Sequence, residues 1–154
     1  MSVYTATVIW SRDGAVFTDG RYSRAHTIAF DGGISIDGSS SPSVVGVPMS
    51  REDAVDPEEM LVASLSACHM LFFTDFARRA GFTLDRYADA AEGVMGKDDR
   101  GRMAMTSVTL NPALAWSGDT VPAHADITAL HHKAHAACFI ANSFRGDVHI
   151  AGVS

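Results

Sequence analysis

Residues 56–81 read DPEEMLVASLSACHMLFFTDFARRAG, and the fold that the sequence predicts is arranged around them. The stretch begins as a helix does, with Asp56 as a capping residue, Pro57 at the first helical position and glutamates in the first turn. It ends with arginines in the last turn and Gly81 just beyond them. About 24 helical residues extend over roughly 36 Å. The sequence therefore predicts one long helix here.

The middle of this predicted helix is apolar nearly all round. Residues 60–73 contain no carboxylate, lysine or arginine, whereas a surface helix shows a single apolar stripe. We therefore expect the helix to be buried on most sides. Cys68, one of two cysteines in the chain, lies at its centre. A thiol in that position is either an inert core residue or the reactive group of the protein.

Length and composition indicate a single domain, residues 1–154, that is large enough to bury a core. Hydrophobic residues make up 47% of the chain and charged residues 19%, as in soluble globular proteins. The net charge of −6 argues against nucleic acid or an anionic membrane as a partner. The apolar stretch 60–73 is too short to span a membrane, and the first residues lack the features of a signal peptide. We therefore expect a cytoplasmic protein without a structural disulfide framework.

The segment before the long helix has the pattern of a small sheet. β-branched and aromatic residues between Gly, Asp and Ser turns predict strands at 3–10, 15–18, 21–30 and 34–36. A loop that starts near residue 38 leads from the last of these strands to the helix at about residue 55.

The segment after the helix combines strands with a second helix. Residues 84–95 match both the strand and the helix periods, but the turn DDRG at 98–101 favours a hairpin with arms at 88–95 and 103–110. The remaining predicted elements are a short strand at 113–116, a helix at 123–144 and a final strand at 147–153. Strands, a long helix, strands, a helix and a last strand are typical of the α+β class.

Each of the two cysteines lies in a predicted helix that is rich in alanine, SACHML around Cys68 and AACFIAN around Cys138. Free cysteine often packs as a small buried hydrophobe, so either one alone could be a core residue. A second cysteine in the other predicted core helix favours a reactive pair. A peroxide-reducing thiol needs a nearby cation to hold its thiolate, and its sulfenic acid needs a second thiol with which to condense. The chain contains both parts.

Residues 55–71, VDPEEMLVASLSACHML, resemble the active-site helix of the OsmC/Ohr family, the osmotically inducible and organic-hydroperoxide-resistance proteins. The family pattern is an Asn/Asp-Pro-Glu motif with a cysteine ten residues after the glutamate, which Glu58 and Cys68 match. Residues 133–143, KAHAACFIANS, match the later helix that carries the second family cysteine, here Cys138. Further stretches resemble an OsmC-like subgroup, so that the likeness covers nearly the whole chain: RYSRAHTIAFDGG at 21–33, SSSP at 39–42 and LHHKAH at 130–135.

The resemblance implies antiparallel sheets packed around a long central helix that carries Cys68, and a thiol peroxidase that needs no cofactor or metal. Cys68 would attack the hydroperoxide and form a sulfenic acid, and Cys138 would resolve it as a disulfide. A dithiol reductant, for example of the lipoyl type, would reopen the disulfide. The family also uses an N-terminal arginine, oriented by the motif glutamate Glu58, to hold the thiolate; Arg12 in the turn SRDG fits best, and Arg24 is the competitor.

Helix geometry adds an expectation of its own about Glu58. Ten residues on one helix separate Glu58 from Cys68 by about 15 Å along the axis and by about 80° around it. Glu58 can then reach the thiol only from a second copy of the chain, so we expect an intertwined homodimer with sites built from both chains. His69 points about 100° away from Cys68, and we expect it to form hydrogen bonds at the interface instead of acting as a base.

The histidines raise an alternative function, a non-catalytic metal- or ligand-binding protein. His131, His135 and Cys138 are spaced to share one helix face, with His132 next to it, and Cys68 could supply a fourth ligand. The competing interpretation is that LHHKAH forms a partly exposed helix surface with one histidine packed near the site.

Overall fold

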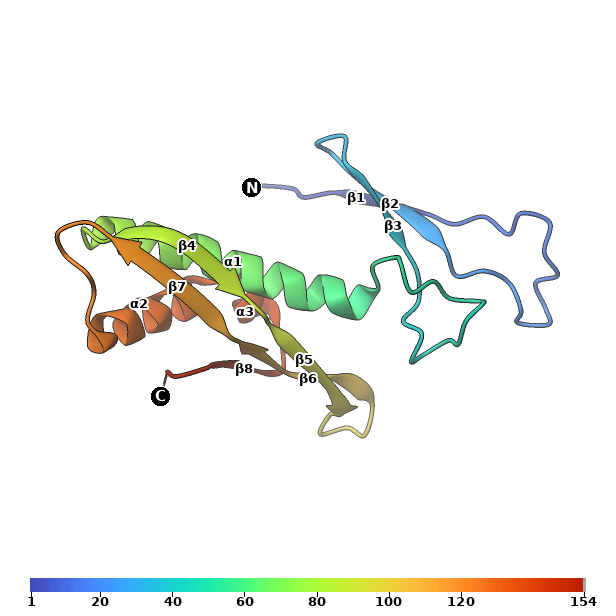
Figure 1. Cartoon of the computed structure of the whole chain (residues 1–154). Coiled ribbons are helices and arrows are strands. Elements are labelled where there is room, and N and C mark those ends of the chain that lie inside the picture. Colours follow the sequence, from blue (N-terminus) through green and yellow to red (C-terminus); the bar gives the residue numbers. More distant parts are fainter. Residues whose placement is uncertain (154) are drawn as a thin grey trace. The chain divides into compact units, whose positions relative to one another are not determined.

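The computed structural model describes residues 1–153 and has the mixed α+β architecture that the order of elements predicts, with three helices and eight strands (Figure 1). The chain divides into two compact units, Met1–Met60 and Leu61–Ser154. Each unit has its own sheet or sheets, and they are described in turn. The single-domain organisation of residues 1–154 stays a prediction.

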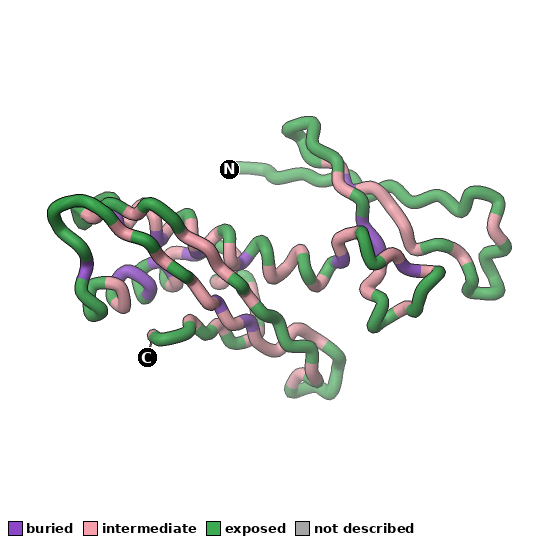
Figure 2. Tube along the Cα trace, viewed as in Figure 1, coloured by how far each residue is buried: buried purple, intermediate pink, exposed green. Residues whose placement is uncertain are grey.

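The first unit contains one antiparallel sheet of three strands, β1 (Ala6–Ile9), β2 (His26–Phe30) and β3 (Ser35–Gly38). The predicted strands near these positions are confirmed; β1 and β2 are shorter than expected, and β3 begins one residue later and extends to Gly38. In the sheet, Ile28 of β2 is buried, whereas every residue of β1 is exposed. Figure 2 shows this exposure along the N-terminal part of the chain.

The prediction of a strand at 15–18 is wrong, because these residues form coil and turn. The turn before them places Gly14 at φ +80°, and Gly20 N–H donates to the Phe17 carbonyl in the turn that follows. Apolar side chains here stack on one another instead of pairing as a strand. The Phe17 ring lies 4.8 Å from Tyr22 and 5.9 Å from Trp10.

The long helix is confirmed as α1, Pro57–Arg79. Its first turn is closed by a reciprocal pair of hydrogen bonds: Glu59 N–H donates to Asp56 Oδ1 at 2.7 Å, and Asp56 N–H donates to Glu59 Oε2 at 3.2 Å. The helix ends at Arg79, and Gly81 just beyond it adopts φ +84°, a conformation that costs glycine little. Local sequence signals therefore determine both ends of α1.

Burial along α1 differs from the expectation. One stripe is buried, formed by Leu65, His69, Phe73 and Ala77 at intervals of four residues. On other positions Ala63, Ala67 and Leu71 are exposed, and Leu71 keeps 62% of its surface. The expectation that the helix is buried on most sides is therefore wrong for the single chain, since the second unit covers only one face of it.

The same apolar composition gives α1 the length and hydropathy of a membrane-spanning helix, and it is the one such helix among residues 1–153. Central helices of soluble proteins can have the same length and hydropathy. The observation therefore carries no argument for a membrane partner.

The second unit has two sheets. In one, β4 (Thr83–Asp89) pairs with β7 (Pro112–Ser117); in the other, β6 (Met103–Leu110) lies between β5 (Glu92–Lys97) and β8 (Asp147–Ile150). All pairs are antiparallel except β6 with β8, which is parallel. The hairpin is confirmed, but its first arm is β5, and the ambiguous stretch 84–95 supplies strands to both sheets. The chain changes sheet after Asp89, whose side chain accepts a hydrogen bond from the Asn111 backbone N–H.

The second predicted helix is two helices, α2 (His124–Ala137) and α3 (Phe139–Ser143). The expectation of one helix at 123–144 is wrong because Cys138 between them has an extended backbone, with φ −67° and ψ 112°. The final strand is confirmed in the shorter form of β8. Two buried clusters hold the unit together: Phe73, Ala77, Leu130 and Ala134 join α1 to α2, and Leu65, Val108 and Leu110 join α1 to β6.

Candidate active site

The two cysteines lie in different local settings of the second unit, and both are free thiols. Cys68 is half-buried in the middle of α1. Cys138 is fully buried at the break between α2 and α3, where its Sγ accepts a hydrogen bond from the Ala141 backbone N–H at 3.4 Å. The thiol thus caps the first turn of α3, a position usually taken by a side-chain oxygen.

The structure brings the two thiols together. The pKa of Cys138 is raised to about 11, chiefly because the thiol is buried. A hydrogen bond with the Cys68 side chain and the charge of Cys68 contribute to this rise, and the Ala141 N–H acts against it. Cys138 is therefore a neutral thiol at pH 7, and it lies within hydrogen-bonding reach of Cys68. Two sulfurs in this relation can form a disulfide after a small movement.

Two contacts join the segments that carry the cysteines. His69, the residue after Cys68, places its Nε2 at 3.0 Å from Nδ1 of His131 on α2. One turn along α1, Phe72 packs edge-to-face against Phe139, the residue after Cys138, with ring centroids 5.0 Å apart. Each cysteine is therefore next in sequence to a side chain that contacts the opposite segment.

His69 and His131 form a buried neutral pair. They are 1% and 2% exposed, and the pKa of each is lowered to about 4, chiefly by burial. The charges of His131 and His135 contribute to the lowered pKa of His69, whereas Asp89 acts in the opposite direction on the pKa of His131. The expectation that His69 lies at an interface is wrong, because the packing of α1 against α2 encloses its ring.

Further polar groups from β4 reach the same region. Asp89 accepts hydrogen bonds from the Ser66 hydroxyl on α1 and from the Asn111 N–H at 2.6 Å. The Tyr87 hydroxyl is buried without a hydrogen-bond partner among residues 1–153, and burial raises its pKa. His69 Nδ1 and His135 Nδ1 are likewise buried and unpartnered within the described chain.

The metal set suggested by helix spacing is not assembled in the second unit. His131 is directed at His69, and Cys138 has left the helical path that would align it with His135. Within residues 1–153, no three His, Cys, Asp or Glu side chains are placed to hold a metal ion.

The other predicted site residues belong to the first unit. Arg12 is an exposed turn residue whose Nη1 donates to the Ala15 carbonyl at 2.8 Å. Arg24 is half-buried, with its guanidinium 3.8 Å from the centre of the Tyr22 ring and a hydrogen bond to the Gly20 carbonyl at 2.7 Å. Glu58 lies in the first turn of α1. A role for any of these residues at the thiol stays a prediction.

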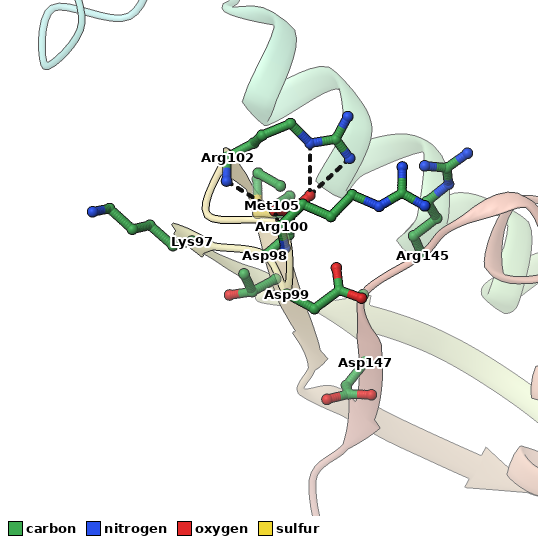
Figure 3. A pocket seen from close by; sticks show the side chains of 11 residues that line it. Lys97, Asp98, Asp99, Arg100, Arg102, Met105, Arg145 and Asp147 are labelled. Atoms are coloured by element: carbon green, nitrogen blue, oxygen red, sulfur yellow. Dashed lines mark hydrogen bonds and ion pairs between the residues drawn. The ribbon is translucent and has the colours of Figure 1, made fainter.

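A charged hollow of about 670 Å³ lies away from the cysteines, between the β5–β6 hairpin and the connection from α3 to β8 (Figure 3). Its acidic and basic residues partly neutralise one another, as in the ion pair of Arg102 with Asp98 at 2.8 Å. The charged lining consists of Lys97, Asp98, Asp99, Arg100, Arg102, Arg145 and Asp147. Neither cysteine lines this hollow, which is therefore separate from the thiol pair.

Comparisons with known proteins identify the family of the chain and its fold. The family model of the OsmC-like proteins matches residues 50–151, which include both cysteines. The chain belongs to the OsmC-like family. A solved OsmC-like protein of unknown function from Vibrio cholerae is 46% identical, with a TM-score of 0.95 over 97% of this chain and 98% of that one. A search of curated proteins finds no significant match.

Two more distant structures share the fold. An organic hydroperoxide resistance protein from Elizabethkingia anophelis is 18% identical, with a TM-score of 0.71 over 97% of this chain and 93% of its own. One from Legionella pneumophila is also 18% identical, with a TM-score of 0.67 over 97% and 94%. The OsmC-like α+β fold and the family are thus confirmed.

The link between His69 and His131 was not predicted from the sequence. A signal was present, because His69 falls in the i, i+4 series Leu65, His69, Phe73 and Ala77 that forms the buried stripe of α1. A histidine in such a series needs a buried hydrogen-bond partner. Nothing in the sequence identifies that partner as His131.

Proposed function

We propose that the protein is a cysteine-based peroxidase that reduces organic hydroperoxides to alcohols. The observation that carries the proposal is the pairing of a partly accessible thiol, Cys68, with a buried thiol, Cys138, within hydrogen-bonding reach. Membership of the OsmC-like family supports it, as does the fold shared with two organic hydroperoxide resistance proteins. We propose that it acts in the response to oxidative stress, as the name of these hydroperoxide resistance proteins implies, and that it does so in the cytoplasm.

The proposed reaction has three steps. The Cys68 thiolate attacks the distal oxygen of the hydroperoxide; an S–O bond forms, the O–O bond breaks, and the alkoxide leaves and takes up a proton to become the alcohol. The Cys138 sulfur then attacks the sulfenic sulfur, and hydroxide leaves with the Cys138 proton as water. A dithiol reductant, such as a lipoyl group, finally reduces the disulfide and is itself oxidised to a disulfide.

The first step requires a cation near Cys68, because the thiolate is the nucleophile. We assign this role to an N-terminal arginine, Arg12 or Arg24, oriented by Glu58. In its present setting Arg12 makes one hydrogen bond to a turn carbonyl, so its guanidinium has unused donors. Arg24 is committed to two backbone carbonyls and the Tyr22 ring, which favours Arg12.

The proposed active form is a homodimer. Glu58 and Cys68 share the helix α1, so their separation of about 15 Å along its axis requires the glutamate to come from a second chain. Exposed apolar residues on two elements support such an interface: Ala63, Ala67 and Leu71 on α1, with Val8 and Ile9 on β1. Burial of these side chains in the dimer would also explain why α1 carries apolar residues on nearly all sides.

The proposal is tested by counting free thiols before and after one equivalent of an alkyl hydroperoxide is added. We expect two thiols to disappear per chain and a Cys68–Cys138 disulfide to appear in peptide mass spectra. The Cys68→Ser variant should consume no hydroperoxide beyond the uncatalysed rate. Full hydroperoxide consumption by that variant, with normal circular dichroism, would rule out the assignment.

A further inference from the structure

A contact between α1 and α2, close to the two cysteines, has no part in the proposed reaction. His69 comes directly after Cys68, and His131 lies about two helical turns before Cys138 on α2. His69 Nε2 and His131 Nδ1 are 3.0 Å apart, and the two rings are nearly parallel, with an angle of 15° between their planes. This is the one side-chain hydrogen bond between α1 and α2 in the described chain.

Burial makes this hydrogen bond persistent. Both histidines are almost fully enclosed, and the Phe73 ring stacks on His131 with centroids 4.3 Å apart. His69 Nδ1 has no partner within residues 1–153, so in the described chain the bond to His131 is the one hydrogen bond of the His69 ring. Breaking the bond would leave two buried polar groups unpaired, which is costly in free energy.

A pair of apolar side chains would fill the same space at a lower cost of desolvation. What a hydrogen bond adds is a defined distance and direction between the two helices, since the donor and acceptor must stay near 3 Å and in line. Disulfide formation has the same kind of requirement, because the two Cβ atoms must come to about 3.8 Å with a torsion near 90°. The Cβ–Cβ distance in disulfides spans only about 3.5–4.5 Å, so an error of about 1 Å in the placement of the two cysteines strains the bond.

We infer that the His69–His131 hydrogen bond is a positioning contact that sets the spacing of α1 and α2 so that Cys68 and Cys138 can form a disulfide. The inference rests on the proposed function, since that function uses the disulfide. It assigns neither histidine to the chemistry itself: neither ring needs to touch the peroxide or take a proton from it. The pair acts through the distance between the sulfurs.

The test measures the equilibrium between the Cys68–Cys138 disulfide and the two thiols in full-length protein, in mixtures of oxidised and reduced dithiothreitol at pH 7. The reaction transfers two electrons and two protons between the protein and dithiothreitol, and alkylation followed by mass spectrometry counts the thiols. The equilibrium constant reports how closely the folded chain holds the sulfurs. It requires no peroxide.

Three variants separate positioning from general packing. His69→Leu removes the hydrogen bond and keeps the site apolar and filled; we expect the equilibrium constant for the disulfide to fall at least tenfold. The double variant His69→Gln with His131→Asn keeps an uncharged donor and acceptor at the ε and δ positions of the two residues. We expect its equilibrium constant for the disulfide to stay within about threefold of the wild-type value. His132→Leu changes an exposed histidine on the same helix and should have no effect.

The inference is overturned if the equilibrium constant of His69→Leu stays within threefold of the wild-type value. It is also overturned if His132→Leu lowers the constant as far as His69→Leu does, or if the constant of the double variant His69→Gln with His131→Asn falls tenfold. Should His69→Leu fail to fold, His131→Leu breaks the same bond from α2 and is judged by the same limits. Wild-type protein that forms the disulfide in dithiothreitol mixtures but consumes no hydroperoxide would contradict the proposed function alone. The two proposals can therefore fail separately.

Discussion

The segments around Cys68 and Cys138 place the same functional group in opposite environments. Cys68 lies inside a continuous 23-residue helix and keeps part of its surface accessible. Cys138 lies where a helix breaks, has no exposed surface, and has a raised pKa because of burial. An accessible thiol can meet a substrate, whereas a buried thiol can meet only what the fold presents to it. The difference supports assigning the peroxide to Cys68 and the resolving step to Cys138.

Replacing the buried thiol should have the largest effect on this comparison. In Cys138→Ser, Cys68 should still reduce one equivalent of hydroperoxide, but turnover with a dithiol reductant should fall on the order of 100-fold because the sulfenic acid has no resolving partner. Stopped-flow peroxide consumption and sulfenic-acid trapping measure the two phases. Serine is a good helix cap, so the start of α3 should be preserved. Undiminished steady turnover would contradict the assigned roles.

Alkylation tests the difference in environment directly. At pH 8 a thiol with a pKa of about 11 has on the order of 100-fold less thiolate than an ordinary cysteine, so Cys138 should react with iodoacetamide at least that much more slowly than a model thiol. Peptide mass spectrometry after timed quenching gives the rate. In urea-unfolded protein, the control, Cys138 should react as an ordinary thiol. Fast labelling of Cys138 in the folded chain would show that it is not buried as described.

Acid should weaken the contact that joins the two segments. The pKa of His69 and of His131 is lowered to about 4, whereas unfolded histidine titrates near 6.5. Between these values the unfolded chain binds more protons than the folded chain, so the free energy of unfolding falls as the pH drops from about 6.5 to about 4. The maximum loss is about 3 kcal/mol per ring.

Urea unfolding at several pH values measures this loss, and the double variant His69→Gln with His131→Asn is the matched control, since its amides do not titrate. We expect the variant to have a flatter dependence on pH than the wild type between pH 6.5 and 4. Equal slopes would mean that groups other than these two histidines are responsible for the acid sensitivity.

The aromatic contact beside the thiols should have the smallest effect. Phe139 is 70% exposed and contacts Phe72 edge-to-face, so Phe139→Ala should lower the free energy of unfolding by about 0.5–1.5 kcal/mol. The Val121→Ala variant, at an exposed position of a loop, is the control and should change the free energy of unfolding by less than Phe139→Ala does. A loss above about 3 kcal/mol would mean that Phe139 is buried in the functional form, as an interface near the cysteines would require.

The two segments also differ in how far the sequence predicted them. The ends of α1 follow from Asp56, Glu59 and Gly81, which act within a few residues of themselves, and both ends are confirmed. The break at Cys138 was not predicted, because AACFIANS contains neither glycine nor proline. The break depends on a thiol that accepts a hydrogen bond from Ala141, an unusual cap with no sequence signature.

Pairings between distant parts of the chain were harder still to predict. The hairpin of β5 and β6 follows from its turn, but the parallel pairing of β6 with β8 joins strands that α2 and α3 separate. Likewise, the apolar pattern of α1 could not indicate which positions the second unit covers. Exposure of Leu71 beside the buried Leu65 and Phe73 depends on the packing of sheets and helices that lie elsewhere in the sequence.

The sequence by itself determined the long helix, the α+β class, the family and the two cysteines as the candidate reactive groups, because caps, turns and family motifs are local patterns of residues. Tertiary structure alone decided that Cys138 is buried beside Cys68 and that His69 bonds to His131. Those relations join residues far apart in the chain, and they arise from the way α1 and α2 pack, which no local pattern encodes.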